Sequence, residues 1–326
     1  MKGDILKILI CPACHSDRPL TLNVINKIDN DIITGSLQCQ DCHTVFEIED
    51  SVPNLLTSDY SRSVQNAFSI QWQMRAKGSL AEKKTLYGKS FKTRIEELEN
   101  VFQEILTNDE SDIWYLEVGS GSGEYIFGLA EKYPAVNFVA MDFSESIRMN
   151  AISSPGLSNL YFVRGDANNP PFKQSKFSAV SALGVLHHTR DTSAAFDAAA
   201  NMVKDGGSLC VWIYPHLSDL AKYYPRLLRW FFRYFYYTRD YIFLGSGHRL
   251  PKKLLAFLIK LYVSPFRLMG KDFFNSMVFI MFDGLVPKYQ HRHTVREIKQ
   301  WYQKNGFAVP RHLNGLFISQ KMEKRS

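Results

Sequence analysis

The chain has 326 residues, a length that allows two domains with a full hydrophobic core. A composition of 45% hydrophobic and 22% charged residues excludes a disordered or low-complexity protein. The net charge of +7 is unevenly placed, because residues 222–271 hold eleven Lys or Arg and one acid, Asp240, which leaves the rest of the chain at −3. This distribution argues against a general nucleic-acid-binding surface.

The apolar segments are too short to suggest insertion into a membrane. No stretch reaches about 18 uncharged apolar residues, so we expect no membrane span. The apolar run at residues 5–10 is short and contains Lys7, which is not typical of a signal peptide. We therefore expect a cytoplasmic protein, with peripheral membrane contact as an alternative for the basic segment.

Residues 1–57 form a predicted small domain that carries four of the five cysteines. Cys11 and Cys14 make one Cys-x-x-Cys pair, Cys39 and Cys42 make a second one, and 24 residues separate the two pairs. Two such pairs can close a tetrahedral site of four thiolates, which structural Zn²⁺ prefers. The sequence therefore predicts a closed zinc site without an open coordination position, and a domain this small is expected to need its metal to fold.

Strands and helices alternate from residue 111 onward, after a predicted helical connection over residues 58–110 that includes a helix at Phe91–Leu106. This alternation predicts βαβ units, and hence an α/β fold with a parallel sheet covered by helices on both faces. A capping box of Thr294 and Glu297 predicts a late helix that stops at Gly306. The expected strands are 113–118, 136–141, 160–163, 177–183, 208–214 and 316–322, and the expected helices between them are 124–132, 145–152 and 192–204.

A glycine-rich loop joins the first of these strands to a helix and contains Glu117, Gly119, Gly121 and Gly123. Glycine is needed where φ is positive or where a ligand approaches the backbone. The dinucleotide fingerprint G-x-G-x-x-G does not fit, since the third glycine comes one residue early. Acids also end the next two predicted strands, Asp142 and Asp166, and ligands of open α/β sheets bind at the carboxyl ends of strands.

These motifs resemble those of class I S-adenosylmethionine-dependent methyltransferases of the type 11 kind, which implies a Rossmann-like sheet and S-adenosylmethionine as cofactor. The resemblance implies that Asp142 binds the ribose hydroxyls and that Asp166 binds the adenine amino group. It also implies that Phe143 and Ala167 border the adenine and that Leu183 lines the methyl-transfer pocket. The cysteine segment resembles the zinc-ribbon activator subunit shared by several methyltransferases.

The sequence Asn169-Pro170-Pro171-Phe172 is similar to a signature of enzymes that methylate amino groups. That signature follows the fourth strand of the sheet, whereas here it precedes it. We therefore interpret it as a structural turn with a buried Phe172.

An insert at about residues 217–282 interrupts the methyltransferase-like region, whose domain is expected to span 111–326. Its densest aromatic part is residues 230–237. In this fold such an insert is expected to be a helical lid, and its basic aromatic character also allows docking on an anionic membrane or stacking on single-stranded RNA.

Four histidines are candidates for a general base if the acceptor is a hydroxyl. His187 and His188 follow the predicted fourth strand, and His291 and His293 precede the capping box. Cys210 lies inside a predicted strand and is expected in the core. The leading hypothesis is methylation of a small-molecule or lipid-linked intermediate, with nucleic acid as an unlikely partner; the alternatives are an RNA methyltransferase and a non-catalytic cofactor-binding protein.

Overall fold

The computed structural model describes residues 1–57, 68–69, 72, 85–86, 89–108, 110–154, 156–215, 236–237, 241–243, 249–251, 257, 260–261, 264–270, 274–275, 277–278, 287, 289–313 and 315–323. The chain divides into two compact units. One unit comprises residues 1–58, 95–215 and 291–326, and the other comprises 59–94 and 216–290.

The N-terminal part of the first unit is a small antiparallel sheet, which we call the ribbon (residues 1–57). After the short 3₁₀ helix η1 (Gly3–Lys7), its strands follow in chain order as β1 (Thr21–Ile28), β2 (Asp31–Gln38), β3 (Val45–Glu49) and β4 (Val52–Pro53). Phe46 and Ile48 of β3 are buried while their neighbours are exposed, the alternation expected of a sheet with one covered face.

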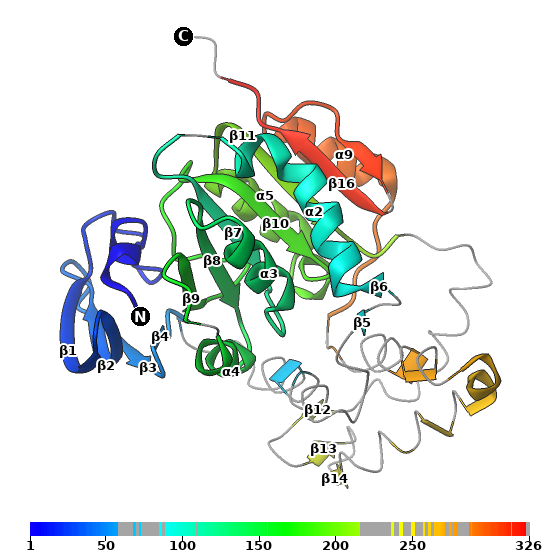
Figure 1. Cartoon of the computed structure of the whole chain (residues 1–326), viewed down its shortest axis with the longest axis horizontal. Helices are drawn as coiled ribbons and strands as arrows, with labels where there is room; N and C mark the ends of the chain where they lie inside the picture. Colours follow the sequence, from blue (N-terminus) through cyan, green and yellow to red (C-terminus); the bar gives the residue numbers. More distant parts are fainter. Residues whose placement is uncertain are drawn as a thin grey trace. The chain divides into compact units, whose positions relative to one another are not determined.

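The rest of the first unit is built on a seven-stranded sheet of order β15-β16-β11-β10-β7-β8-β9 (Figure 1). The parallel strands are β7 (Trp114–Val118), β8 (Asn137–Asp142), β9 (Leu160–Arg164), β10 (Phe177–Leu183) and β11 (Val203–Trp212). Two antiparallel strands, β16 (Leu316–Gln320) and β15 (Arg311–Leu313), complete one edge. The expected parallel sheet is therefore correct for the five strands β7 to β11 and wrong for the edge formed by β16 and β15.

Helices cover both faces of this sheet, and alternate residues of β7 divide between two cores. Leu116 faces a core shared with α5 (Thr192–Met202), α9 (Val295–Lys304) and the ribbon. Tyr115 faces a core shared with α2 (Phe91–Leu106), α3 (Glu124–Lys132) and α4 (Ser146–Ser153). Burial on both faces explains why the inner strands read as continuous apolar runs.

Most predicted elements agree with the structure within two residues, and α2, α3 and β10 have the predicted bounds. The strand predicted at 208–214 is β11, which begins earlier, at Val203, and ends at Trp212, so the helix predicted to end at residue 204 ends at Met202. The Thr294–Glu297 capping box is present, and Gly306 has a φ of +78° beyond the end of α9. Cys210 is fully buried, as predicted.

The ribbon docks on the β9 edge of the sheet and on the turn before β10. Leu55 donates its N–H to the carbonyl of Arg164 at 2.9 Å, and Ile10 donates to the carbonyl of Pro171 at 3.0 Å. Phe172 is 2% exposed and packs edge-on against Phe177. The Asn-Pro-Pro-Phe segment is thus a structural turn with a buried Phe172, and it also binds the ribbon backbone.

Of the second unit, the structure describes the strand pair β5 (Thr85–Leu86) and β6 (Lys89–Ser90), the three-stranded sheet β12 (Tyr236–Tyr237), β13 (Tyr241–Phe243) and β14 (Arg249–Pro251), and the 3₁₀ helix η3 (Ser264–Met269). The insert was predicted to be helical, but its described part contains the strands β12 to β14 as well as η3. The rest of the insert, including Trp230, and most of the predicted helical connection before residue 85 lie outside the described residues. Among the described residues, no helix combines the length and apolar character needed to cross a bilayer.

Candidate functional site

The glycine-rich loop between β7 and α3 has a backbone that only glycine adopts easily. Gly119, Gly121 and Gly123 have φ values of +73°, +54° and +80°. A Cβ atom on Gly119 would also lie 2.2 Å from Cγ2 of Val185, in the loop that follows β10. The loop therefore packs directly against the carboxyl end of the neighbouring strand.

Asp142, the last residue of β8, is bonded to this loop. Its Oδ2 accepts the N–H of Gly121 at 2.8 Å, and its Oδ1 accepts the N–H and the hydroxyl of Ser144 at 2.8 and 2.6 Å. Burial raises the pKa of Asp142, and the hydrogen bonds from Ser144 and Gly121 and the charge of Arg164 oppose that rise. The carboxylate is held in one orientation but keeps lone pairs for further donors.

Glu117 of β7 is 3% exposed, and its Oε2 has no hydrogen-bond partner among the residues that the structure describes. Burial raises its pKa well above the ordinary value, and the nearby acids Glu124 and Asp142 raise it further. A buried carboxylate of this kind is costly unless a cation or donor meets it. This orphaned oxygen fits a site for a positively charged ligand group.

Asp166 follows β9, accepts the N–H of Asn168 at 2.9 Å and has a pKa raised by burial. Ala167 is 9% exposed, whereas Phe143 and Leu183 are partly buried. Because β7, β8, β9 and β10 are parallel, all of these residues lie at the carboxyl ends of the strands, on the same side of the sheet as the glycine loop. The donors and acceptors at these strand ends fit a nucleoside that carries an ammonium group.

The four predicted histidines come together beyond β10 and β11. His187 is stacked on Tyr214, with ring centroids 3.9 Å apart, and lies 4.3 Å from His188. The N–H of His291 donates to the carbonyl of His187 at 2.9 Å, and the N–H of His293 donates to that of Tyr214 at 3.1 Å. Residues separated by about a hundred positions thus form one histidine cluster (His187, His188, His291 and His293).

The members of this cluster differ in their hydrogen bonds. Nδ1 of His187 accepts the N–H of Tyr214 at 3.3 Å, so the proton of the neutral ring is on Nε2. Burial lowers the pKa of His187 well below 6.5, and the positive charges of its neighbours lower it further. Nδ1 of His293 lies 4.0 Å from Oε2 of Glu297, and its side chain is 17% exposed.

The four predicted cysteine ligands converge in the ribbon, and their Sγ atoms all lie within 4.8 Å of one another. The Sγ atoms of Cys11 and Cys42 are 3.6 Å apart, as are those of Cys14 and Cys39. Zn–S bonds of about 2.3 Å in a tetrahedron would place sulfur atoms about 3.8 Å apart, which this arrangement fits. His15 and His43 are exposed at the two turns, each with a φ of +59°, and do not belong to the cluster.

Several residues of the site were not predicted from the sequence. Ser144 could have been found from its position two residues after an acid that ends a strand. Arg148 and Arg164, which join the ribbon to the turn after β8, carry no such local signal. Apart from Glu145, which is three residues before Arg148, their acidic partners are close to them only in the folded chain.

Two family models match the chain. Residues 116–211 match the methyltransferase domain, and residues 2–51 match the Trm112p-like protein family. Each match covers less than a third of the chain, so they identify two segments of it.

Among curated relatives, the tRNA (guanine-N(7)-)-methyltransferase of Staphylococcus epidermidis is 37% identical over 71 residues, which are 20% of this chain and 33% of that protein. The demethylmenaquinone methyltransferase of Roseiflexus castenholzii is 28% identical over 94 residues, which are 29% of this chain and 40% of that protein. The chain thus spans about a third of the length of the first relative.

Solved structures show weaker likenesses. The complex of the Haloferax volcanii Trm112 methyltransferase activator with a methyltransferase matches with a TM-score of 0.46 and 12% identity, over 81% of this chain and 100% of that one. Magnesium protoporphyrin IX methyltransferase from Synechocystis has a TM-score of 0.46 and 12% identity, over 79% and 98%. Because both scores lie below 0.5, the fold assignment rests on the strand order and the family matches.

Proposed function

Since the chain carries a methyltransferase domain at residues 116–211 behind a Trm112p-like domain at residues 2–51, we propose that it transfers a methyl group from S-adenosylmethionine to a small-molecule or lipid-linked acceptor. The observation that carries the cofactor assignment is the bonded pair of Gly121 and Asp142 beside the orphaned Glu117. The cofactor supplies an activated methyl group on its sulfonium, and the protein supplies alignment and electrostatics.

Each of the three acids at the carboxyl ends of the strands has a proposed role in binding the cofactor. Asp142 accepts the ribose hydroxyls with the lone pairs that Gly121 and Ser144 leave free. Glu117 meets the ammonium group, and its burial supports this role because a cation would compensate a carboxylate whose Oε2 has no partner among the described residues. Asp166 accepts from the adenine amino group, and Phe143 and Ala167 border the ring.

The histidine cluster is the proposed acceptor side. His187, neutral and protonated on Nε2, acts as a hydrogen-bond donor that orients the acceptor. His293 is the better candidate for a general base, because it is less buried and the carboxylate of Glu297 faces its Nδ1. Leu183 and Val185 line the route between the cofactor loop and this cluster, supported by the close approach of Val185 to Gly119.

A structural Zn²⁺ is the proposed occupant of the four-cysteine site. A site with four thiolates has no position for a substrate, so the metal would hold the two turns of the ribbon together and take no part in methyl transfer. This role agrees with the surface position of the site in the ribbon, where Cys14 and Cys42 are exposed.

RNA methylation is the second candidate, and the names of several relatives support it. They are tRNA (guanine-N(7)-)-methyltransferases, although the match covers only about a third of the first of them. This finding weakens the expectation from the charge distribution that nucleic acid is an unlikely partner. The non-catalytic alternative is disfavoured by the intact loop and acids.

A labelling experiment separates the two enzymatic candidates. Purified protein is incubated with methyl-labelled S-adenosylmethionine and either an organic extract of cells or total RNA from the same cells. We expect label in the organic-extractable fraction, none above background in RNA, and none in either fraction with Asp142→Ala. Label in RNA alone would replace the leading proposal with the second candidate.

A further inference from the structure

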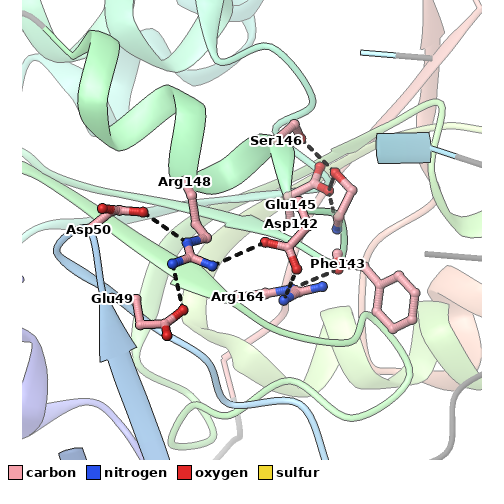
Figure 2. Close-up of polar contacts among 9 residues, drawn as sticks. Glu49, Asp50, Asp142, Phe143, Glu145, Ser146, Arg148 and Arg164 are labelled. Carbon is pink, nitrogen blue, oxygen red and sulfur yellow. Dashed lines mark hydrogen bonds and ion pairs between the residues drawn. The ribbon is translucent and has the colours of Figure 1, made fainter. Parts of the chain in front are cut away.

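Two arginines connect the ribbon to the turn that follows β8, and they do so through a continuous chain of ion pairs (Figure 2). One end of this chain is Glu49 and Asp50, at the end of β3 in the ribbon. The other end is the turn of residues 142–146, which contains Asp142 and Phe143. We call these contacts the arginine relay (Glu49, Asp50, Arg148, Glu145 and Arg164).

Arg148 of α4 is the centre of the relay. Its NH2 group lies 2.5 Å from Oε2 of Glu49, its Nε donates to Oδ2 of Asp50 at 3.1 Å, and its NH1 group lies 3.6 Å from Oε2 of Glu145. One guanidinium thus binds carboxylates of the ribbon and of the cofactor turn together, which its planar fork allows. Burial lowers the pKa of Arg148, but the three carboxylates outweigh it and raise the pKa overall.

Arg164, the last residue of β9, continues the relay into the turn. Its NH1 group lies 2.5 Å from Oε1 of Glu145, and its Nε donates to the carbonyl of Phe143 at 3.3 Å. Its side chain is 8% exposed and that of Glu145 is 43% exposed, so this ion pair is only partly shielded from water. Its backbone carbonyl accepts the N–H of Leu55, so the same residue binds the ribbon by its main chain.

The relay therefore holds the turn at two points, the carbonyl of Phe143 and the carboxylate of Glu145. Phe143 directly follows Asp142, whose carboxylate binds Gly121. Asp142 and Phe143 are the residues proposed to meet the ribose and the adenine. If this turn moves, the acceptor geometry at Asp142 changes, and hydrogen bonds weaken steeply when their geometry is poor.

We propose that Arg148 is a positioning residue for the cofactor, through which the ribbon sets the affinity of the cofactor site. This inference rests on the proposed function, since it takes the turn of residues 142–146 to hold S-adenosylmethionine. It assigns the ribbon a role in ligand affinity within the same chain, in addition to its packing on the sheet.

A second ion pair between the ribbon and the sheet provides a matched control. Nζ of Lys7 lies 3.1 Å from Oδ1 of Asp112, which precedes β7. This pair also crosses from the ribbon to the sheet, but it lies at the amino ends of the parallel strands, away from the glycine loop. A role limited to holding the two parts together predicts equal behaviour for the two pairs.

The test measures the binding of S-adenosylhomocysteine by isothermal titration calorimetry and the thermal unfolding of each ligand-free variant. The variants are Arg148→Gln, Arg148→Lys, the double variant Glu49→Gln with Asp50→Asn, and the control Lys7→Gln. For partly exposed ion pairs we expect Arg148→Gln and the double variant to weaken binding about threefold to tenfold. Lys7→Gln should leave the affinity unchanged, and Arg148→Lys should give an intermediate value.

Combining Arg148→Gln with the double variant should weaken binding less than the product of the separate effects, because the same bonds are removed twice. If wild type binds and all variants bind as Lys7→Gln does, with only their unfolding temperatures lowered, the relay is merely structural and the inference is wrong. If wild type does not bind S-adenosylhomocysteine, the proposed function fails, and this inference fails with it.

Discussion

Oδ2 of Asp142 accepts the backbone N–H of Gly121 at 2.8 Å, which ties the last residue of β8 to the glycine loop after β7. Asn150 of α4 donates its side-chain amide to the carbonyl of Gly121 at 2.9 Å, so both polar groups of this glycine are held. The glycine loop therefore has its conformation fixed before any ligand binds, and the part of the proposed cofactor site formed by this loop and Asp142 is preorganised.

Replacement of Gly119 by alanine should disrupt this arrangement. The new Cβ atom would lie 2.2 Å from Val185 on a backbone with a φ of +73°, which is unfavourable for alanine. We expect Gly119→Ala to destabilise the protein by about 1–3 kcal/mol in chemical denaturation and to weaken cofactor binding. Gly3→Ala is the control, because a Cβ at Gly3 meets no atom within 4 Å, and an equal loss in both variants would contradict this explanation.

The buried carboxyl of Glu117 should make the ligand-free protein less stable as the pH rises. Its pKa in the folded state is raised above 4.5 by burial and by Glu124 and Asp142, so the folded state retains the proton over a range in which the unfolded state has lost it. The free energy of unfolding should therefore decrease as the pH rises from about 4.5 through the pKa of Glu117 in the folded state. Glu117→Gln should make this decrease less steep. In thermal unfolding, each kcal/mol of recovered stability should appear as a rise of about 2–4 °C in the unfolding temperature.

The slope should flatten without vanishing, since burial also raises the pKa of Asp142. Glu131→Gln, on the exposed surface of α3, is the control and should follow wild type. If the unfolding temperature of Glu117→Gln depends on pH from 4.5 to 8 as that of wild type does, the pKa of Glu117 is not raised in the folded state.

His187 should remain neutral in the folded protein. Its pKa is lowered well below 6.5 by burial and by the surrounding His188, His293, Arg292 and His291, so the unfolded state takes up a proton that the folded state refuses. Its contribution to stability should therefore be lost as the pH falls below about 6.5. Long-range ¹H–¹⁵N NMR should show the Nε2–H form from pH 6 to 8. Protonation on Nδ1 would contradict the assigned role as a donor.

Removal of the metal should unfold the ribbon and weaken its docking on the sheet. Structural zinc in small domains contributes about 10 kcal/mol or more of apparent folding free energy at pH 7. We expect about one zinc per chain by elemental analysis, a marked loss in Cys14→Ser, and a lower unfolding temperature with a chelator. Cys210→Ala is the control, because Cys210 is buried in β11 and should not affect the metal content.

Patterns within single segments allowed most of the fold to be predicted. The apolar runs indicated the inner strands, and the Thr294–Glu297 spacing indicated where α9 begins. The antiparallel edge was missed because a buried strand reads the same in either direction. Strand β15 was missed because its residues are all exposed and give no alternation.

The site divides in the same way. Asp142 and Asp166 could be singled out because each is a polar residue that ends or follows an apolar run, and Glu117 because it is the one acid inside such a run, next to the glycine loop. The relay through Arg148 could not be predicted, because Glu49 and Arg148 are 99 positions apart. Exposed acids and arginines are common in any sequence, so their presence does not indicate which of them form a pair. The contact of His187 with His291 likewise depends on the folded chain.

The most direct test of the central claim is the affinity of S-adenosylhomocysteine for wild type and for Asp142→Ala, measured by calorimetry on proteins whose circular dichroism spectra agree. Loss of two charge-assisted hydrogen bonds to the ribose should weaken binding about 100-fold or more. Asp205→Asn, at an exposed position near the start of β11, should bind as wild type does. An Asp142→Ala protein that binds S-adenosylhomocysteine as tightly as wild type would contradict the assignment of the cofactor site.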